Sequence, residues 1–118
     1  MMYKPTVNSN DFNIIPIKII KLQKRVVNQL KKHNWDGDYN QFKVESDTGV
    51  VGELMRMDDM MNAMRDLREL PPIVIKKIEL YTPPHINVPK YKYTIWDGAH
   101  RIAASILMGY DVIPVVYI

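Results

Sequence analysis

The sequence predicts one small domain that combines α-helices with β-strands. Its 118 residues are close to the usual size of a single domain, and such a chain can bury roughly two-thirds of its unfolded surface. Segments rich in β-branched residues alternate along the chain with segments whose apolar residues recur at helical spacing. Apolar residues make up 47% of the chain and charged residues 25%, and this balance favours a soluble globular protein.

The N-terminal part is expected to begin with a loose leader over residues 1–11, which is polar and lacks the apolar core of a secretory signal. Residues 12–52 form the part of the domain whose elements are least distinct. The β-branched run from Ile14 to Ile20 favours a strand, and Pro16 restricts that strand to an edge or a bulge.

A basic amphipathic helix is expected next, because apolar residues fall on one helical face from Ile19 to Leu30. Residues 33–52 are rich in Asn, Asp and Gly and are predicted to form a loop, with a short strand or an irregular segment from Gln41 to Val51. Three aromatic residues of this stretch either stack on nucleic-acid bases or anchor the loop to the core: Trp35, Tyr39 and Phe42.

Helical periodicity returns in a methionine-rich stripe from Met57 to Leu67, which Pro71 and Pro72 are expected to end. We interpret this stripe as core rather than as an adaptable binding groove. The segments Ile73–Leu80 and Tyr91–Trp96 predict a hairpin, a helix follows from Ala99 to Leu107 with Gly109 as its C-terminal cap, and a last strand covers Val112–Tyr117.

Composition excludes some kinds of chemistry and suggests an anionic partner. The chain has no cysteine, which excludes disulfides, thiolate zinc sites and thiol catalysis. No apolar run approaches the roughly 20 residues of a membrane helix, so we expect a cytoplasmic protein with no membrane contact. The net charge is +3, and no acid separates Asp11 from Asp36 while six bases do: Lys18, Lys21, Lys24, Arg25, Lys31 and Lys32.

The segment from Asp97 to Arg101 carries the clearest functional pattern. A strand, an Asp-Gly turn and a helix follow one another, so the free amides and positive dipole of the helix N-terminus lie at the turn. His100 is expected beside the apolar face of the helix and Arg101 roughly opposite it, where both can help to hold a phosphate. The alternative is structural: Asp97 as N-cap, Gly98 as turn residue and Arg101 as a solvated charge.

The segment DGAHRIAASILMGYDVIPVVYI, from Asp97 to Ile118, resembles the end of ParB/sulfiredoxin-like domains. Those domains have a Gly-containing turn, His-Arg or Arg-Arg, an alanine-rich helix, a Gly and a closing Ile-Pro-Val strand. Upstream, Glu69-Leu70-Pro71-Pro72-Ile73-Val74 is similar to the family's Pro-Pro-Ile strand entry. The similarity covers residues 57–118 clearly and residues 14–20 weakly.

The resemblance implies an α+β fold with a small mixed sheet and flanking helices. It also implies a phosphate-binding loop at Gly98, Ala99, His100 and Arg101, which in relatives takes ATP, ADP or CTP, usually with magnesium. Asp97 would then bind magnesium or act as a base. Relatives reduce peroxiredoxin, phosphorylate serine, form nucleotide-gated DNA clamps or act as nucleases, so the fold alone selects no reaction.

This chain departs from the family pattern at several positions, and these departures limit the activities that the resemblance implies. Sulfiredoxins place their cysteine where this chain has Ala99, so sulfiredoxin chemistry is excluded. The helix-turn-helix and dimerisation domain of chromosome-partitioning ParB proteins do not follow Ile118, so we expect a stand-alone member that suits a phage or mobile element. The serine kinases of the superfamily are most similar at Asp97–Arg101, and their upstream general base corresponds to Glu53 as our candidate.

The leading hypothesis is therefore a nucleotide-binding protein with phosphotransfer or nucleotide hydrolysis as its activity. The second is a DNA-binding or nuclease-like accessory protein that uses the same phosphate cradle and a basic helix. Its nucleic-acid contacts would be Lys21, Lys24, Arg25 and Lys32. A third hypothesis is a catalytically silent module that binds a protein partner.

Overall fold

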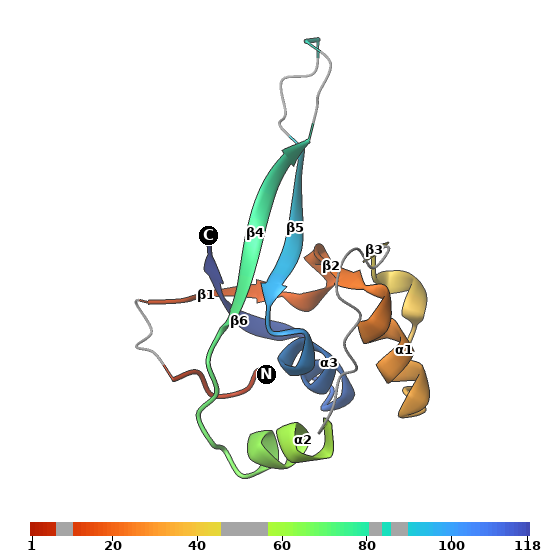
Figure 1. Cartoon of the computed structure of the whole chain (residues 1–118), viewed down its shortest axis with the longest axis vertical. Helices are drawn as coiled ribbons and strands as arrows, with labels where there is room; N and C mark the ends of the chain where they lie inside the picture. The colour runs from red at the N-terminus through yellow and green to blue at the C-terminus, as the bar shows by residue number, and fades with distance from the viewer. Residues whose placement is uncertain (7–10, 46–56, 81–83, 86–89) are drawn as a thin grey trace.

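A computed structural model describes residues 1–6, 11–45, 57–80, 84–85 and 90–118. Figure 1 shows the whole chain. The described elements follow one another as β1 (Asn13–Pro16), a 3-10 turn (Ile17–Ile19), β2 (Ile20–Gln23), α1 (Lys24–Lys32), a second 3-10 turn (Tyr39–Gln41), β3 (Val44–Glu45), α2 (Met57–Arg65), β4 (Ile73–Leu80), β5 (Lys90–Asp97), α3 (Ala99–Leu107) and β6 (Val112–Tyr117).

The strands form one mixed sheet in the order β1-β6-β4-β5-β2-β3, in which two-residue β3 extends five longer strands. β4 pairs antiparallel with β5 and parallel with β6, whereas β2 runs parallel to β5. β1 pairs antiparallel with β6 at the edge of the sheet. The expectation of an α+β domain with a small mixed sheet and flanking helices is confirmed at this level.

The core lies between one face of the sheet and the helices. α3 packs between α1 and α2 and against β4, and α1 also packs on β2. Alternate residues of the central strands are fully buried on this face, as Ile73 and Ile75 show in β4. Figure 1 shows the helices gathered around α3 while the β4–β5 ribbon extends away from them. Among the helices described, none has the length and apolar character needed to cross a membrane.

Several expected elements are confirmed with their boundaries. The strand Ile73–Leu80 and the helix Ala99–Leu107 occupy the predicted residues, and β4 and β5 form the predicted antiparallel hairpin. Pro16 lies in an edge strand, as expected. These segments could be predicted from the sequence because their apolar pattern and the turn residues at their ends indicate the same elements. The strand expected from Ile14 to Ile20 is wrong in its second half, because β1 ends at Pro16 and a 3-10 turn covers Ile17–Ile19.

The predicted helix from Ile19 to Leu30 is wrong in its first turn. Residues Ile20–Gln23 form β2, and α1 begins only at Lys24. Ile20 and Leu22 are fully buried while the residues after each are half-buried, which is the alternation of a strand. Pairing with β5 decides between the two patterns, because a buried parallel strand satisfies its backbone through its neighbour.

The predicted end of the methionine helix is also wrong, because α2 ends at Arg65 and not at the two prolines. Leu67 has a positive φ of 57°, and the amides of Leu67 and Arg68 donate to the carbonyls of Met64 and Ala63. This is the Schellman arrangement that normally uses glycine. Leu67 is 73% exposed and therefore does not belong to the buried face of α2. The interpretation of the methionine stripe as core is confirmed for Met57 and Met64, which are buried.

Two segments expected to be irregular contact the core. Tyr3, in the expected loose leader, is only 2% exposed, and its hydroxyl donates to the Pro71 carbonyl at 2.7 Å. Residues 7–10 of that leader lie outside the described residues. In the loop after α1, the Trp35 ring contacts the rings of Tyr39 and Phe42 at centroid separations of 4.8 and 5.5 Å. All three rings pack against the core, so they anchor the loop.

Replacing Leu67 by glycine should stabilise the domain. A left-handed conformation costs an L-residue about 1–2 kcal/mol, and this exposed side chain contributes little packing. The glycine entropy cost offsets part of that gain, so we expect the free energy of unfolding to rise by about 0.5–1 kcal/mol and the midpoint by a few degrees.

The matched control is Gly109→Ala at the end of α3, where φ is 79° and an added Cβ meets nothing within 4 Å. This change should destabilise by about 1 kcal/mol through backbone strain alone. Thermal unfolding of both variants measures the effect, and a lower midpoint for Leu67→Gly would contradict the account of the α2 terminus.

Candidate phosphate-binding site

Two helices, α1 and α3, begin side by side where the carboxyl ends of two neighbouring strands meet, and we call this end of the sheet the shared edge. β2 and β5 are parallel neighbours, with Ile20 opposite Tyr93 and Lys21 opposite Thr94, so their carboxyl ends meet at the same edge. α1 starts directly after β2, α3 starts one residue after β5, and the two helices pack against each other. Each helix start presents free amides and the positive end of a macrodipole.

Neither helix start is neutralised by its own sequence. The N-cap residues Gln23 and Gly98 make no side-chain cap hydrogen bond, and neither first turn contains an acidic residue. Lys24 and Arg25 instead add positive charge to the first turn of α1, where a cation opposes the macrodipole. The arrangement therefore places two positive dipole ends and two basic side chains at the shared edge, where the carboxylate of Asp97 is the opposing charge. Positive dipole ends of this kind attract anions.

Gly98 makes the sharp turn from β5 into α3 with φ 115° and ψ 24°. A Cβ at this position would lie 2.6 Å from Cγ2 of Ile73, which is fully buried. The structure therefore shows a packing reason for this glycine, because close approach of α3 to β4 already excludes any larger residue here.

His100 and Arg25 lie within electrostatic range of each other in the first turns of the two helices. His100 lies half-buried in the first turn of α3. Burial lowers its pKa, and the charges of Arg25 and then Arg101 lower it further, so the neutral ring is favoured. The Nε of Arg25 donates to Oε1 of Gln23 at 2.8 Å, which holds the guanidinium at the end of β2.

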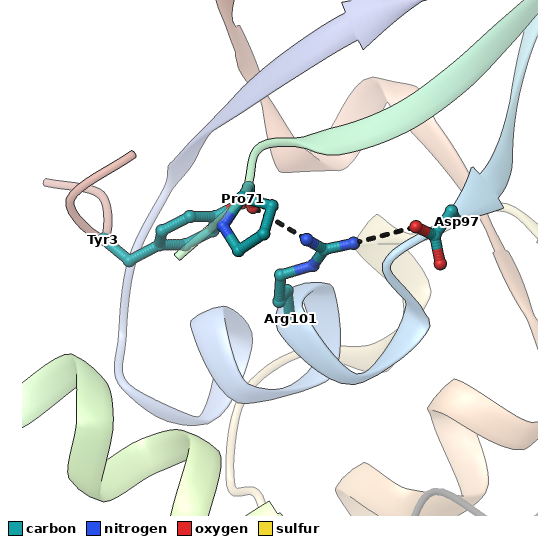
Figure 2. A network of polar contacts seen from close by, with 4 residues as sticks. All are labelled: Tyr3, Pro71, Asp97 and Arg101. Carbon is teal, nitrogen blue, oxygen red and sulfur yellow. Dashed lines mark hydrogen bonds and ion pairs between the residues drawn. The ribbon is translucent and has the colours of Figure 1, made fainter. Parts of the chain in front are cut away.

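Arg101 faces the interior, so its expected place opposite the apolar face is wrong. Arg101 is only 9% exposed. Its Nη1 donates to the Pro71 carbonyl at 3.0 Å, and its Nη2 donates to Oδ2 of Asp97 at 3.3 Å. Figure 2 shows this guanidinium between Pro71 and Asp97, with Tyr3 on the other side of Pro71. α3 is packed on several sides, which buries a position that its apolar stripe left outside.

Asp97 is the exposed carboxylate of the site, with 72% of its side chain accessible. It does not cap α3, because Gly98 is the N-cap residue and Asp97 Oδ2 contacts Arg101. No group of three or more His, Cys, Asp or Glu side chains suited to a metal occurs within the described residues. Magnesium held mainly by phosphates and water needs only one or two carboxylates, so Asp97 fits as a single protein ligand.

The other predicted site residues lie on different elements or outside the described residues. Glu53, the candidate base, lies outside the described residues. Lys21 belongs to β2, while Lys24 and Lys32 occupy opposite ends of α1, about 12 Å apart at 1.5 Å per residue.

α1 is amphipathic as expected, because Val26, Val27 and Leu30 are its buried residues. Contact of its basic residues with nucleic acid stays a prediction, and Arg25 is the one whose charge reaches His100 in the Asp97–Arg101 segment.

A cleft lies at the opposite end of α3. Its volume is about 530 Å³, and aromatic side chains line it together with Lys18 and Asp111. None of its lining residues belongs to the segment from Asp97 to Arg101. The segment from Asp97 to Arg101 and this cleft are thus separate features, located at the two ends of one helix.

The pairing of Arg25 with His100 was not predicted. The sequence contained an indication of it. A β-branched run precedes Lys24, and a basic first helical turn follows, which is the same order of strand and helix as around Asp97–Arg101. That indication was missed because the helical pattern was extended back to Ile19, so the strand before Lys24 was not separated from the helix.

No protein-family model, curated protein or solved structure matches the chain at significant similarity.

The buried position of Arg101 predicts that Arg101→Ala destabilises the domain in the absence of any ligand. Loss of its packing and of its bond to the Pro71 carbonyl should cost about 2 kcal/mol, or several degrees in the unfolding midpoint. Lys24→Ala, an exposed change in the first turn of α1, is the control and should leave the midpoint nearly unchanged. Equal midpoints for Arg101→Ala and the native protein would contradict the structural role of this guanidinium.

Proposed function

We propose that the chain is a nucleotide-binding domain of the ParB/sulfiredoxin superfamily and holds the phosphates at the edge where α1 and α3 begin. The observation that carries this proposal is the pair of helix N-termini without side-chain caps, which follow the parallel neighbours β2 and β5 and carry Arg25 and His100 in their first turns. Two such termini are ready-made donors for phosphate oxygens.

The clustering of positive charge supports an anionic ligand. After burial, the charge of Arg25 is the next cause that lowers the pKa of the His100 imidazole, so Arg25 lies within electrostatic range of the ring. Lys24 and Arg25 also oppose the dipole of α1, at a cost of a few tenths of a kcal/mol each. A bound phosphate would offset both the repulsion between Arg25 and protonated His100 and the unfavourable interaction of Lys24 and Arg25 with the dipole of α1. The planar guanidinium of Arg25 can donate two parallel hydrogen bonds to two phosphate oxygens.

Arg101 serves this site as a positioning residue. Its guanidinium donates to Pro71 and Asp97 and is nearly enclosed, so it holds Asp97 at the mouth of α3. The direct phosphate contacts then fall to Arg25, His100 and the amides that follow Gly98, with Ala99 contributing backbone alone. This division differs from the sequence expectation in which Arg101 itself is a phosphate ligand.

Phosphotransfer or nucleotide hydrolysis is the reaction that suits these groups. The exposed carboxylate of Asp97 can accept a proton from an attacking hydroxyl or water, or bind magnesium. Bound magnesium would supply charge neutralisation at the phosphates. ATP, ADP and CTP are the ligands that the family resemblance favours.

A nucleotide that binds this edge should raise the midpoint of thermal unfolding. A ligand at 100 times its dissociation constant stabilises the native state by about 2.7 kcal/mol, which corresponds to several degrees. We expect such a shift with one of ATP, ADP or CTP in the presence of magnesium. The shift should fall by more than half in Arg25→Ala and in His100→Asn.

Lys32→Ala, at the far end of α1, is the matched control and should keep the full shift. An equal shift in Arg25→Ala, His100→Asn and native protein would place the nucleotide elsewhere. No shift with any nucleotide, with or without magnesium, would contradict the proposed function.

The lowered pKa of His100 predicts a pH dependence of stability. Because the native pKa lies below the unfolded value of about 6.5, the native state binds fewer protons in the interval between them. The free energy of unfolding should therefore fall as pH is lowered through this interval, and His100→Asn should remove that part of the loss. Sulfate, which keeps its charge in this range, should favour protonated His100 and reduce the loss in the native protein.

Urea unfolding from pH 7.5 to 5 measures these slopes. An identical pH dependence in the native protein and His100→Asn, with and without sulfate, would contradict the role of His100 at an anion site.

A further inference from the structure

The sheet has an outer face, turned away from the helices, on its strands β2, β4 and β5. Lys21 lies opposite Thr94, and Thr94 lies opposite Lys76, so these three residues form one row across three neighbouring strands. The two lysines are therefore about 10 Å apart, twice the usual strand spacing. Trp96 is the next outward residue along β5 and is 65% exposed.

Trp96 and Lys76 form a local unit. The Nζ of Lys76 lies 5.7 Å from the centroid of the Trp96 ring, which is the geometry of a cation–π contact. This contact orients the indole on the sheet surface while most of the side chain stays accessible to solvent. An exposed, oriented indole beside a cation is a stacking platform for a flat, electron-rich ring that carries negative charge nearby.

The outer face carries two basic side chains, Lys21 and Lys76, among the outward residues that the structure describes on β2, β4 and β5. The acid next to them is Asp97, which lies opposite Val74 at the end of β5 and is paired with Arg101 at 3.3 Å. Gln23, another outward residue of β2, accepts a hydrogen bond from Arg25, so the outer face continues into the positively charged edge of the sheet. A partner with regularly spaced negative charges complements this surface.

We propose that the outer face of β2, β4 and β5 binds single-stranded nucleic acid, with a base stacked on Trp96 and phosphates next to Lys21 and Lys76. Base stacking on an exposed aromatic ring requires an unpaired base, which a duplex does not offer. A protein partner is less well matched, because the exposed apolar side chains are isolated among polar and basic ones. This binding uses residues that the proposed nucleotide site does not, and so does not depend on it.

The test is fluorescence anisotropy with a fluorescein-labelled oligothymidylate at low ionic strength. Trp96→Ala should weaken binding about tenfold or more, and Trp96→Phe should recover most of the affinity because it keeps an aromatic face. Lys76→Gln should reduce the slope of log K against log salt by about 0.7, the value for one phosphate contact on a single strand.

Leu67→Ala and Lys32→Gln are the matched controls, since they remove an exposed apolar and a basic side chain elsewhere and should bind like the native protein. Trp96 is exposed, so circular dichroism and the unfolding midpoint should be the same for its variants. In a Trp35→Phe background, Trp96 is the remaining tryptophan of the chain, and its fluorescence should be quenched by the oligonucleotide.

Absence of oligonucleotide binding at low salt would overturn the proposal, as would equal affinity of the native protein and Trp96→Ala. Tighter binding of a duplex of the same length, without quenching of Trp96, would indicate backbone attraction alone and would also overturn it. The nucleotide-dependent thermal shift separates the two proposals, because Trp96→Ala should retain that shift and His100→Asn should retain the quenching.

Discussion

The Arg101 guanidinium, enclosed at the foot of α3, is the interaction on which the rest of the structure depends. It joins the carbonyl of Pro71, just before β4, to the carboxylate of Asp97 at the end of β5. The Tyr3 hydroxyl donates to the same carbonyl and brings the N-terminal segment to this point. One side chain thus fixes where β4 begins, where β5 ends and how α3 leaves the sheet, and a buried charge of this kind is tolerated because its hydrogen bonds are made.

Two surfaces meet at the edge that Arg101 organises. On the helix side, α1 and α3 begin together because β2 and β5 are parallel neighbours, which brings Arg25 and His100 close to each other. On the opposite side, the same two strands carry Lys21 and Trp96 outward. The parallel pairing of β2 with β5 is therefore the constraint that gives the domain a positively charged edge and an adjoining aromatic platform.

Sequence patterns predicted the second half of the fold well and the first half poorly. β4, α3 and β6 combine a clear apolar period with turn residues at their ends, so local and tertiary preferences agree. β2 could not be separated from α1, because two buried residues spaced by two fit either pattern until β5 supplies the partner strand. The burial of Arg101 was unpredictable for a similar reason, since helical periodicity describes one apolar face and α3 is packed on several.

The most direct test of the account is a two-dimensional amide NMR titration of the native protein with magnesium and the nucleotide that gives the largest thermal shift. If phosphates bind at the paired helix starts, the largest shifts should fall on the backbone amides of Lys24, Arg25, Ala99 and His100, while the Arg101 side-chain Nε–H signal changes little. Shifts centred on the cleft lined by Trp35 and Tyr110, at the other end of α3, would contradict the central claim.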